Sequence, residues 1–389
     1  MPGHSHRRKH TSNFRAGSSS SRNSGKASSS SSSASSSSGP NTIDNVVEKV
    51  MMWKEQFMFD DCIKLLNKTI KQFSSSPRVV DLLFLMGEVY LQNGDSLNAK
   101  HFLQQAVQVN PKHYPSLMYL GQVSEANESA QYFSQGLTVM QELLNSNSGN
   151  IEEIKQLYIQ GLCSVCELYM TDLCFEPNAE QECEKCVGMA QEFYRNVPIQ
   201  NWDVGLLQTL AHLRMCQCKP EEGKQFMQVV AQKVIEEGNR LKESTDSSFN
   251  DLVMGYDFKL STAKNLIELQ MHQEAKTILE QLKDQFDQVV DLWYLLGICC
   301  DSLGQSDVAI KYLEKALKIG KQIQEDGMFL NEVKDELNLI KQKLSQSGVQ
   351  NPGSDLIDED EDEWEDVVED YLESNNEVVD EDDDAEMNG

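Results

Sequence analysis

Two pairs of cysteines have the spacing of a metal site. Cys163 and Cys166 form one C-x-x-C pair, Cys183 and Cys186 form a second, and sixteen residues separate the pairs. That separation is typical of four-cysteine zinc sites, in which deprotonated thiols hold the ion. Both pairs, however, fall where apolar residues recur at helical spacing, and neither carries the glycine or proline of a metal-binding turn. Because cysteine packs readily at small core positions, we favour packing, with zinc as the alternative, and predict no cofactor.

No other residue pattern indicates catalysis. The chain contains no G-x-S-x-G, G-x-x-x-x-G-K-[ST] or G-x-G-x-x-G motif and no H-E-x-x-H pair. Three of its seven histidines lie within the first ten residues. The adjacent pair Cys299 and Cys300 lies inside a helical pattern, so we interpret it as core, not as a nucleophile. We therefore predict that the protein is not an enzyme.

The charge of the chain is large, negative and unevenly distributed. The formal net charge is −28 over 389 residues; residues 1–40 hold six basic residues and no acid, and residues 355–389 hold nineteen acids and no base. A charge of −15 therefore remains on the segment between them. Such a chain repels nucleic acid and anionic membranes and attracts cations. We expect a basic protein as partner, with no direct binding to nucleic acid or membrane.

Composition also predicts the compartment. No apolar run reaches the roughly 18 to 20 residues that cross a bilayer, and the N-terminal segment is polar where a secretion signal is apolar. We expect the protein in the cytoplasm and the nucleus. Its ten cysteines are then expected as thiols, because disulfides rarely persist there.

The middle of the chain repeats a helical pattern. Residues 79–109 read VVDLLFLMGEVYLQNGDSLNAKHFLQQAVQV, and residues 289–319 read VVDLWYLLGICCDSLGQSDVAIKYLEKALKI. With Gly87 at position eight of a 34-residue unit, small and large apolar residues fall where the tetratricopeptide pattern requires them. In that pattern glycine and alanine let two antiparallel helices approach closely, and neighbouring helix pairs cover each other's apolar faces.

Further units of the same pattern follow along the chain. They are predicted at 114–147, 204–237, 256–289 and 290–323, after a degenerate unit near 46–73 and before a terminal helix within 324–347. The 210-residue offset between the two clearest copies is not a multiple of 34, which predicts an irregular pair across about 150–200. The sequence therefore predicts an all-α tetratricopeptide-repeat solenoid over 41–347. Disordered segments are expected on both sides: a serine-rich basic tail at 1–40 and an acidic tail at 348–389.

The first helix of each pair is expected to line a groove. Its positions two, five, nine and twelve interleave carboxylates with apolar and aromatic residues, which suits a basic, partly hydrophobic extended peptide. Alternatively, these acids only keep an exposed surface soluble. The residues at these positions are Asp81, Phe84, Glu88, Leu91, Met118, Gln122, Glu125, Asp257, Leu260, Lys264, Asp291, Tyr294, Ile298 and Asp301.

The acidic tail contains one amphipathic stretch. Trp364, Val367, Val368 and Tyr371 recur at helical spacing among acids, so this stretch is predicted to become a short helix on a partner. Alone it should not be helical, because helix nucleation is costly and the negative charge opposes it.

The combination of these parts resembles a known family. A variable N-terminal segment, a tetratricopeptide superhelix and a terminal acidic segment, here DLIDEDEDEWEDVVEDYLE, are similar to the dedicated assembly chaperones of large-subunit ribosomal protein L-four. The resemblance covers roughly residues 41–389. It implies capture of newly made L-four, shielding of its basic internal loop, and escort to the nucleus with a nuclear import factor as a further partner.

Two departures and two alternatives accompany this resemblance. A short turn near Asn127 and the cysteine-rich segment differ from the family pattern and affect the middle of the groove. A histone-binding chaperone would also combine tetratricopeptide repeats with acidic blocks. A generic scaffold of a multiprotein complex would need no acidic groove.

Overall fold

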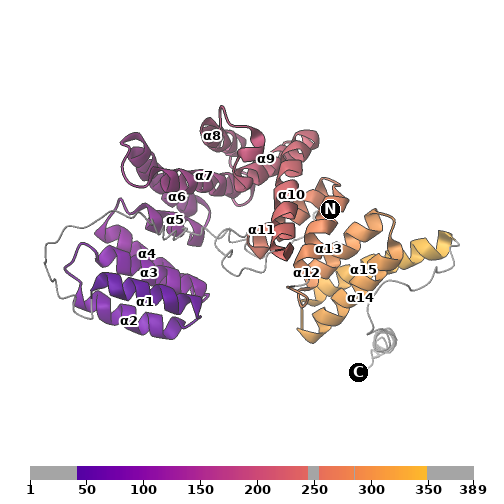
Figure 1. Cartoon of the computed structure of the whole chain (residues 1–389), viewed down its shortest axis with the longest axis horizontal. Helices are drawn as coiled ribbons and strands as arrows, with labels where there is room; N and C mark the ends of the chain where they lie inside the picture. Colours follow the sequence, from indigo (N-terminus) through magenta and orange to yellow (C-terminus); the bar gives the residue numbers. More distant parts are fainter. Residues whose placement is uncertain (1–41, 244–253, 284, 348–389) are drawn as a thin grey trace, which may run out of the picture. The chain divides into compact units, whose positions relative to one another are not determined.

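The computed structural model describes residues 42–243, 254–283 and 285–347 (Figure 1). Within these residues the chain forms fifteen α-helices, one short 3-10 helix and no strand, so the predicted all-α fold is confirmed. The chain divides into two compact units, residues 1–226 (unit 1) and 227–389 (unit 2). Residues 1–40 and 348–389, for which disorder was predicted, lie outside the described residues.

Unit 1 is built from consecutive helix pairs. α1 packs on α2, α3 on α4, α5 on α6 and α7 on α8, and the second helix of the first three pairs also contacts the next pair. The helices are α1 (Ile43–Glu55), α2 (Phe59–Gln72), α3 (Val79–Gln92), α4 (Ser96–Val109), α5 (Tyr114–Val123), α6 (Ala126–Asn145), α7 (Ile151–Met170), α8 (Ala179–Glu192), η1 (Ile199–Asn201) and α9 (Val204–Cys216).

Unit 2 repeats this arrangement. α11 packs on α12, α13 on α14, and the terminal helix α15 on α14. The boundary between the units falls inside α10, which is the longest helix described. The remaining helices are α10 (Pro220–Glu243), α11 (Tyr256–Glu268), α12 (His272–Lys283), α13 (Val290–Ser302), α14 (Ser306–Gln322) and α15 (Gly327–Ser347).

Close approach of the two helices in a pair depends on glycine. A Cβ added at Gly87 of α3 would lie 2.7 Å from Cγ of Leu103 on α4, and one at Gly297 of α13 would lie 2.7 Å from Leu313 on α14. Both leucines are fully buried. The two units therefore use the same contact, which is why these positions match between the two copies in the sequence.

The turn inside most helix pairs contains a left-handed residue, although the turn between α7 and α8 does not. Gly94 (φ 80°) and Gly304 (φ 75°) occupy position fifteen of their repeats, and Cys218 (φ 58°) and Gln270 (φ 61°) occupy the same position in theirs. Phe57 (φ 58°) lies in the turn between α1 and α2. A side chain in this conformation costs about 1 kcal/mol or more relative to glycine. The helix pair therefore imposes the turn even where the sequence carries no glycine.

The middle of unit 1 departs from the regular repeat in two ways. α5 ends at Val123, repeat position ten, whereas α3 ends at Gln92, position thirteen; the short turn predicted near Asn127 follows. α7 then runs for 20 residues, against 14 for α3, and contacts α9 as well as α6 and α8. α7 carries the first C-x-x-C pair, and α8 carries the second.

Candidate functional site

Glu88 organises the first-helix face of unit 1, defined by Asp81, Phe84, Glu88 and Leu91 of α3. Its carboxylate accepts a hydrogen bond from Tyr119 Oη at 2.9 Å and pairs with Lys54 Nζ at 3.4 Å. The side chains of Lys54 and Glu88 are only 14% and 15% exposed. Because water is largely excluded, losing one partner of this pair costs more than losing one partner of a surface pair.

Aromatic rings surround Phe84 on this face. Its ring lies edge-on to Tyr119, with 5.2 Å between centroids, and 5.4 Å from the ring of His113. Burial lowers the pKa of His113, with Asp81 acting in the opposite direction, so the imidazole is neutral at pH 7. The face therefore places an apolar aromatic cluster beside the carboxylate of Glu88. Asp81 itself is half-buried and is paired with Arg78 at 3.3 Å.

Two contributors to this face were not predicted. Tyr119 follows Met118, the position assigned to the groove, and Lys54 belongs to the degenerate first repeat. Lys54 and Glu88 are 34 residues apart, and so are Asp44 and Arg78, which form a second pair at 2.7 Å. The repeat length was therefore a usable signal, because residues at equal register lie on neighbouring first helices.

The prediction for Met118 is wrong. Met118 is fully buried: a Cβ added at Gly136 would lie 2.7 Å from its Sδ, and one at Gly161 would lie 2.6 Å from its Cε. The side chain thus fills a notch left by two glycines, one on α6 and one on α7. Gln122 is half-buried on α5, and Glu125 is exposed in the extended residue before α6. Leu91 is half-buried against the core of unit 1.

The first-helix face of unit 2 combines acids with cations in the same way. Lys264 Nζ lies 3.7 Å from Asp291, and Lys343 Nζ lies 3.1 Å from Asp301, whose other oxygen accepts from Ser306 at 3.0 Å. Asp257 is exposed in the first turn of α11, Ile298 is half-buried, and Leu260 is buried at 8% exposure. Leu260, which was predicted to line the groove, is therefore a core residue.

Tyr294 links this face of unit 2 to the terminal helix. Its hydroxyl donates to Glu332 at 3.0 Å, and its ring lies edge-on to Phe329 at 5.5 Å. Burial, followed by the charge and hydrogen bond of Glu332 and the charge of Glu336, raises the pKa of Tyr294. As on α3, an aromatic ring lies beside carboxylates.

Most predicted groove carboxylates of both units therefore have a cation of the same chain beside them. Asp81, Glu88, Asp291 and Asp301 are each paired with a lysine or arginine. A basic partner would compete with these cations. The role of these residues in binding a partner stays a prediction, and Trp364, Val367, Val368 and Tyr371 of the tail lie outside the described residues.

The four cysteines of the C-x-x-C pairs are buried between α7 and α8. Cys183 Sγ donates to the backbone oxygen of Cys166 at 3.5 Å, and all four side chains are at most 7% exposed. Burial raises the pKa of Cys163, and that of Cys186 to about 12. Over the described ranges, no group of three or more potential ligands is arranged to hold a metal ion. Cys299 and Cys300 are fully buried, as predicted.

Glu167 is an acid within this same part of the core. It lies one turn after Cys163 on α7, its side chain is half-buried, and burial raises the pKa of its carboxyl to about 7. The unfolded chain ionises this group near pH 4.5, so between about pH 4.5 and 7 the folded state retains a proton that the unfolded state has lost. Stability from this group is therefore complete below that window and is lost as the pH rises through it.

Substitution Glu167→Gln should stabilise the protein in alkaline solution. We expect the free energy of unfolding to rise by about 1–2 kcal/mol at pH 8 and to change little at pH 4.5, as measured by urea denaturation. Glu176→Gln, at an exposed glutamate of the following turn, serves as the control and should have little effect at either pH. A gain in stability for Glu167→Gln that is equal at both pH values would contradict the raised pKa of the Glu167 carboxyl.

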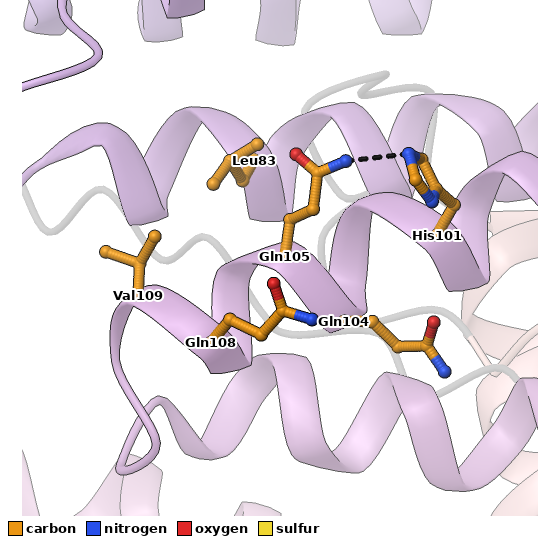
Figure 2. A pocket seen from close by; sticks show the side chains of 6 residues that line it. All are labelled: Leu83, His101, Gln104, Gln105, Gln108 and Val109. Carbon is orange, nitrogen blue, oxygen red and sulfur yellow. Dashed lines mark hydrogen bonds between the residues drawn. The ribbon is translucent and has the colours of Figure 1, made fainter.

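A shallow depression of about 500 Å³ lies along α4 (Figure 2). Gln105 and His101 are joined there by a hydrogen bond of 2.7 Å between Nε2 atoms. All lining residues are neutral or apolar apart from this histidine: Leu83, His101, Gln104, Gln105, Gln108 and Val109. The depression therefore offers amides and no carboxylate to a basic partner.

In the described part of the chain, no helix is both long and apolar enough to span a membrane.

Comparison with known proteins agrees with the fold. The tetratricopeptide repeat pattern is matched at residues 80–113 and 290–321, the two clearest units in the sequence. The solved structure of a protein named Assembly Chaperone of RpL4 (Acl4), residues 1–338, is similar with a TM-score of 0.54 and 23% identity, covering 68% of this chain and 97% of that one. That likeness concerns the fold.

Two curated relatives carry the same name, probable assembly chaperone of rpl4. The one from Emericella nidulans is 26% identical over 246 residues, 60% of this chain and 57% of the relative. The one from Schizosaccharomyces pombe is 30% identical over 254 residues, 64% of this chain and 71% of the relative. The chain, with its tetratricopeptide pairs, therefore belongs to the family of assembly chaperones of rpl4.

Proposed function

We propose that this protein is a binding chaperone that captures newly made ribosomal protein L-four, shields its basic internal loop, and accompanies it from the cytoplasm to the nucleus for assembly of the large ribosomal subunit. The observation that carries the proposal is the 30% identity with the fission-yeast relative over 254 residues. The role is binding and release, without catalysis.

The first-helix face of unit 1 provides suitable chemistry for such a loop. A lysine or arginine of the client would exchange with Lys54 for the carboxylate of Glu88, which already has Tyr119 as a second partner. The aromatic ring of Phe84 would cover the aliphatic part of the incoming side chain, and arginine also stacks on such rings. Because one cation replaces another, capture costs little desolvation of the carboxylate and is reversible.

The charge of the whole chain supports the same client class. A ribosomal protein loop evolved to be neutralised by rRNA binds polyanions before assembly, and a chain of net charge −28 attracts such a loop over distances of about a Debye length, roughly 8 Å at physiological salt. We propose a nuclear import factor as a further partner, because escort to the nucleus requires one.

Affinity purification during active translation tests the proposal. The tagged full chain should recover L-four as the dominant polypeptide, and recovery should depend on nascent L-four. Histones in its place would favour the alternative histone chaperone. Several unrelated proteins of one stable complex would favour a scaffold, and either result would overturn the proposed client.

Deletion of residues 355–389 should weaken capture. The deletion removes nineteen carboxylates, so we expect about a tenfold lower affinity for L-four at low salt and a smaller difference at 0.5 M salt. Calorimetry and client sedimentation measure both effects. Unchanged affinity together with unchanged client solubility would exclude a role for the tail in capture.

A further inference from the structure

The turn between α2 and α3 contains a serine that the proposed function does not use. Ser76 is followed by Pro77 and Arg78, and no other serine or threonine of the chain precedes a proline. Proline at the next position is the feature by which proline-directed protein kinases select a serine, because proline has no backbone N–H for the kinase to satisfy. Although the chain is rich in serine, it therefore contains a single acceptor of this kind.

The turn around Ser76 is open to an enzyme. Its neighbours Ser75 and Pro77 are exposed, and Ser76 is half-buried. The N–H of Ser76 donates to the backbone oxygen of Phe73 at 2.9 Å, and its own oxygen accepts from Val79 N at 3.0 Å. Because these two hydrogen bonds lie at the ends of α2 and α3, the turn can extend into a kinase while both helices stay packed.

Arg78 lies directly beside this serine. Its backbone N–H donates to Ser76 Oγ at 3.3 Å. Its side chain donates to the two carboxylate oxygens of Asp44 at 2.7 and 3.1 Å, and to Asp81 at 3.3 Å. The side chains of Arg78, Asp44 and Asp81 are 50%, 72% and 40% exposed, and pairs as exposed as these contribute little to stability. Arg78 can therefore change partners readily.

A phosphate on Ser76 would be the stronger partner for Arg78. It carries a charge of about −1.5 to −2 at pH 7 and three acceptor oxygens, against one charge and two oxygens for a carboxylate. Arginine binds phosphate through two parallel hydrogen bonds, as it now binds Asp44. The Cα atoms of Ser76 and Arg78 are at most about 7 Å apart, a distance that the arginine side chain covers.

We propose that a proline-directed protein kinase phosphorylates Ser76 and that the phosphate takes Arg78 away from both carboxylates. Asp81, which belongs to the first-helix face of unit 1, then becomes available to a basic partner. In the reaction Ser76 Oγ attacks the γ-phosphorus of ATP on the kinase. The new O–P bond forms as the bond to the bridging oxygen of ADP breaks, and the hydroxyl proton passes to the catalytic carboxylate of the kinase. The modification is independent of the client, whereas the use of Asp81 rests on the proposed function.

Incubation of the full chain with ATP and a purified cyclin-dependent kinase tests the modification. We expect phosphate on Ser76, located by mass spectrometry, and its loss in both the Ser76→Ala and the Pro77→Ala variants. Ser75→Ala changes a serine that no proline follows, so this control variant should be phosphorylated as the parent chain is. No incorporation, phosphate on other residues only, or incorporation that survives Pro77→Ala would overturn the proposal.

Phosphorus NMR of the modified chain tests the contact with Arg78. The second ionisation of phosphoserine lies near pH 6, and a neighbouring guanidinium favours the dianion. We therefore expect the pKa of the phosphate to be at least about 0.5 lower in the parent chain than in the Arg78→Gln variant. Arg195→Gln, at an arginine whose side chain is 71% exposed, is the control and should leave this pKa unchanged. Equal phosphate pKa values in the parent and in Arg78→Gln would overturn the proposal.

Calorimetry with L-four tests the consequence for the first-helix face of unit 1. We expect the phosphorylated chain to bind L-four about three- to tenfold more tightly than the unmodified chain at low salt. Arg78→Gln should gain part of this affinity without phosphate, and phosphorylation should add less to this variant than to the parent. Unchanged affinity, or an equal gain in both chains, would overturn the release of Asp81. If no form binds L-four, the proposed function fails, and the kinase and NMR results still decide the modification.

Discussion

Substitution Gly87→Val is expected to lower the free energy of unfolding of unit 1 by about 2–4 kcal/mol. The new Cβ would lie 2.7 Å from Cγ and 2.8 Å from Cδ2 of Leu103. Leu103 is fully buried, so its side chain or the α3–α4 pair must shift. Urea unfolding followed by circular dichroism measures the loss, and Gly297→Val should produce the same effect in unit 2 through Leu313.

The chain offers a matched control for this substitution. Gly188 is also helical, on α8, but a Cβ added there meets no atom within 4 Å. Gly188→Val should therefore change stability by less than about 0.5 kcal/mol, because valine has the better helix propensity and meets no obstacle. A loss at Gly188 as large as that at Gly87 would show that the contact with Leu103 does not explain the effect.

A double-mutant cycle makes the same prediction sharper. Leu103→Ala alone should cost about 2–5 kcal/mol, because it leaves a cavity. In the double variant the new valine partly fills that cavity, so the combined cost should fall at least about 1 kcal/mol short of the sum of the two single costs. Strict additivity would mean that the two residues do not touch.

The second large effect concerns affinity for the client. Asp81→Lys combined with Glu88→Lys should weaken binding of L-four by about 10–100-fold at low salt. The two substitutions change the charge of the first-helix face of unit 1 by four, remove the acceptor of Tyr119 Oη, and place a second cation beside Lys54. The salt dependence of the affinity should become shallower at the same time. Isothermal titration at two salt concentrations measures both quantities.

A variant with the same change in net charge controls for long-range attraction. Glu128 and Glu142 lie on α6, the second helix of the α5–α6 pair. They pair with Lys100 and Lys112 at 2.6 and 2.7 Å, respectively. Glu128→Lys with Glu142→Lys should lower the affinity less than about threefold, because these carboxylates lie outside the proposed face. Equal losses of affinity for the two variants would show that the net charge of the protein, and not the first-helix face of unit 1, explains the effect. The melting temperature of each variant is needed, since loss of the shielded Glu88 pair also lowers stability.

Much of the fold could be predicted from the sequence, because small residues at fixed spacing report where helices touch. Gly87 and Gly297 established the register, and the helices of the regular pairs begin and end close to the positions that this register predicts, unlike α5 and α7. The left-handed turns at Cys218 and Gln270 gave no signal, since the closing of the helix pair imposes that conformation against the local preference of the residue.

The candidate site was less predictable. Periodicity identifies one side of a helix but not the rotation of the next helix against it. For this reason Met118 and Leu260 turned out to be core residues, and the buried Tyr119, not Met118, contacts Glu88. The predicted carboxylates have cationic neighbours that periodicity did not indicate, because Lys54, Lys264 and Lys343 approach the acids from other helices.

The pairs that are 34 residues apart have a mechanical consequence. Lys54 of α1 pairs with Glu88 of α3, and Asp44 of α1 pairs with Arg78, the residue before α3, so both ion pairs link successive helix pairs. The Lys54–Glu88 pair is the more shielded of the two, so a partner that displaced Lys54 from Glu88 would lower the torsional stiffness of unit 1 between these helix pairs. Binding of the partner would then change the elasticity of this protein, and dissociation of the partner would restore it.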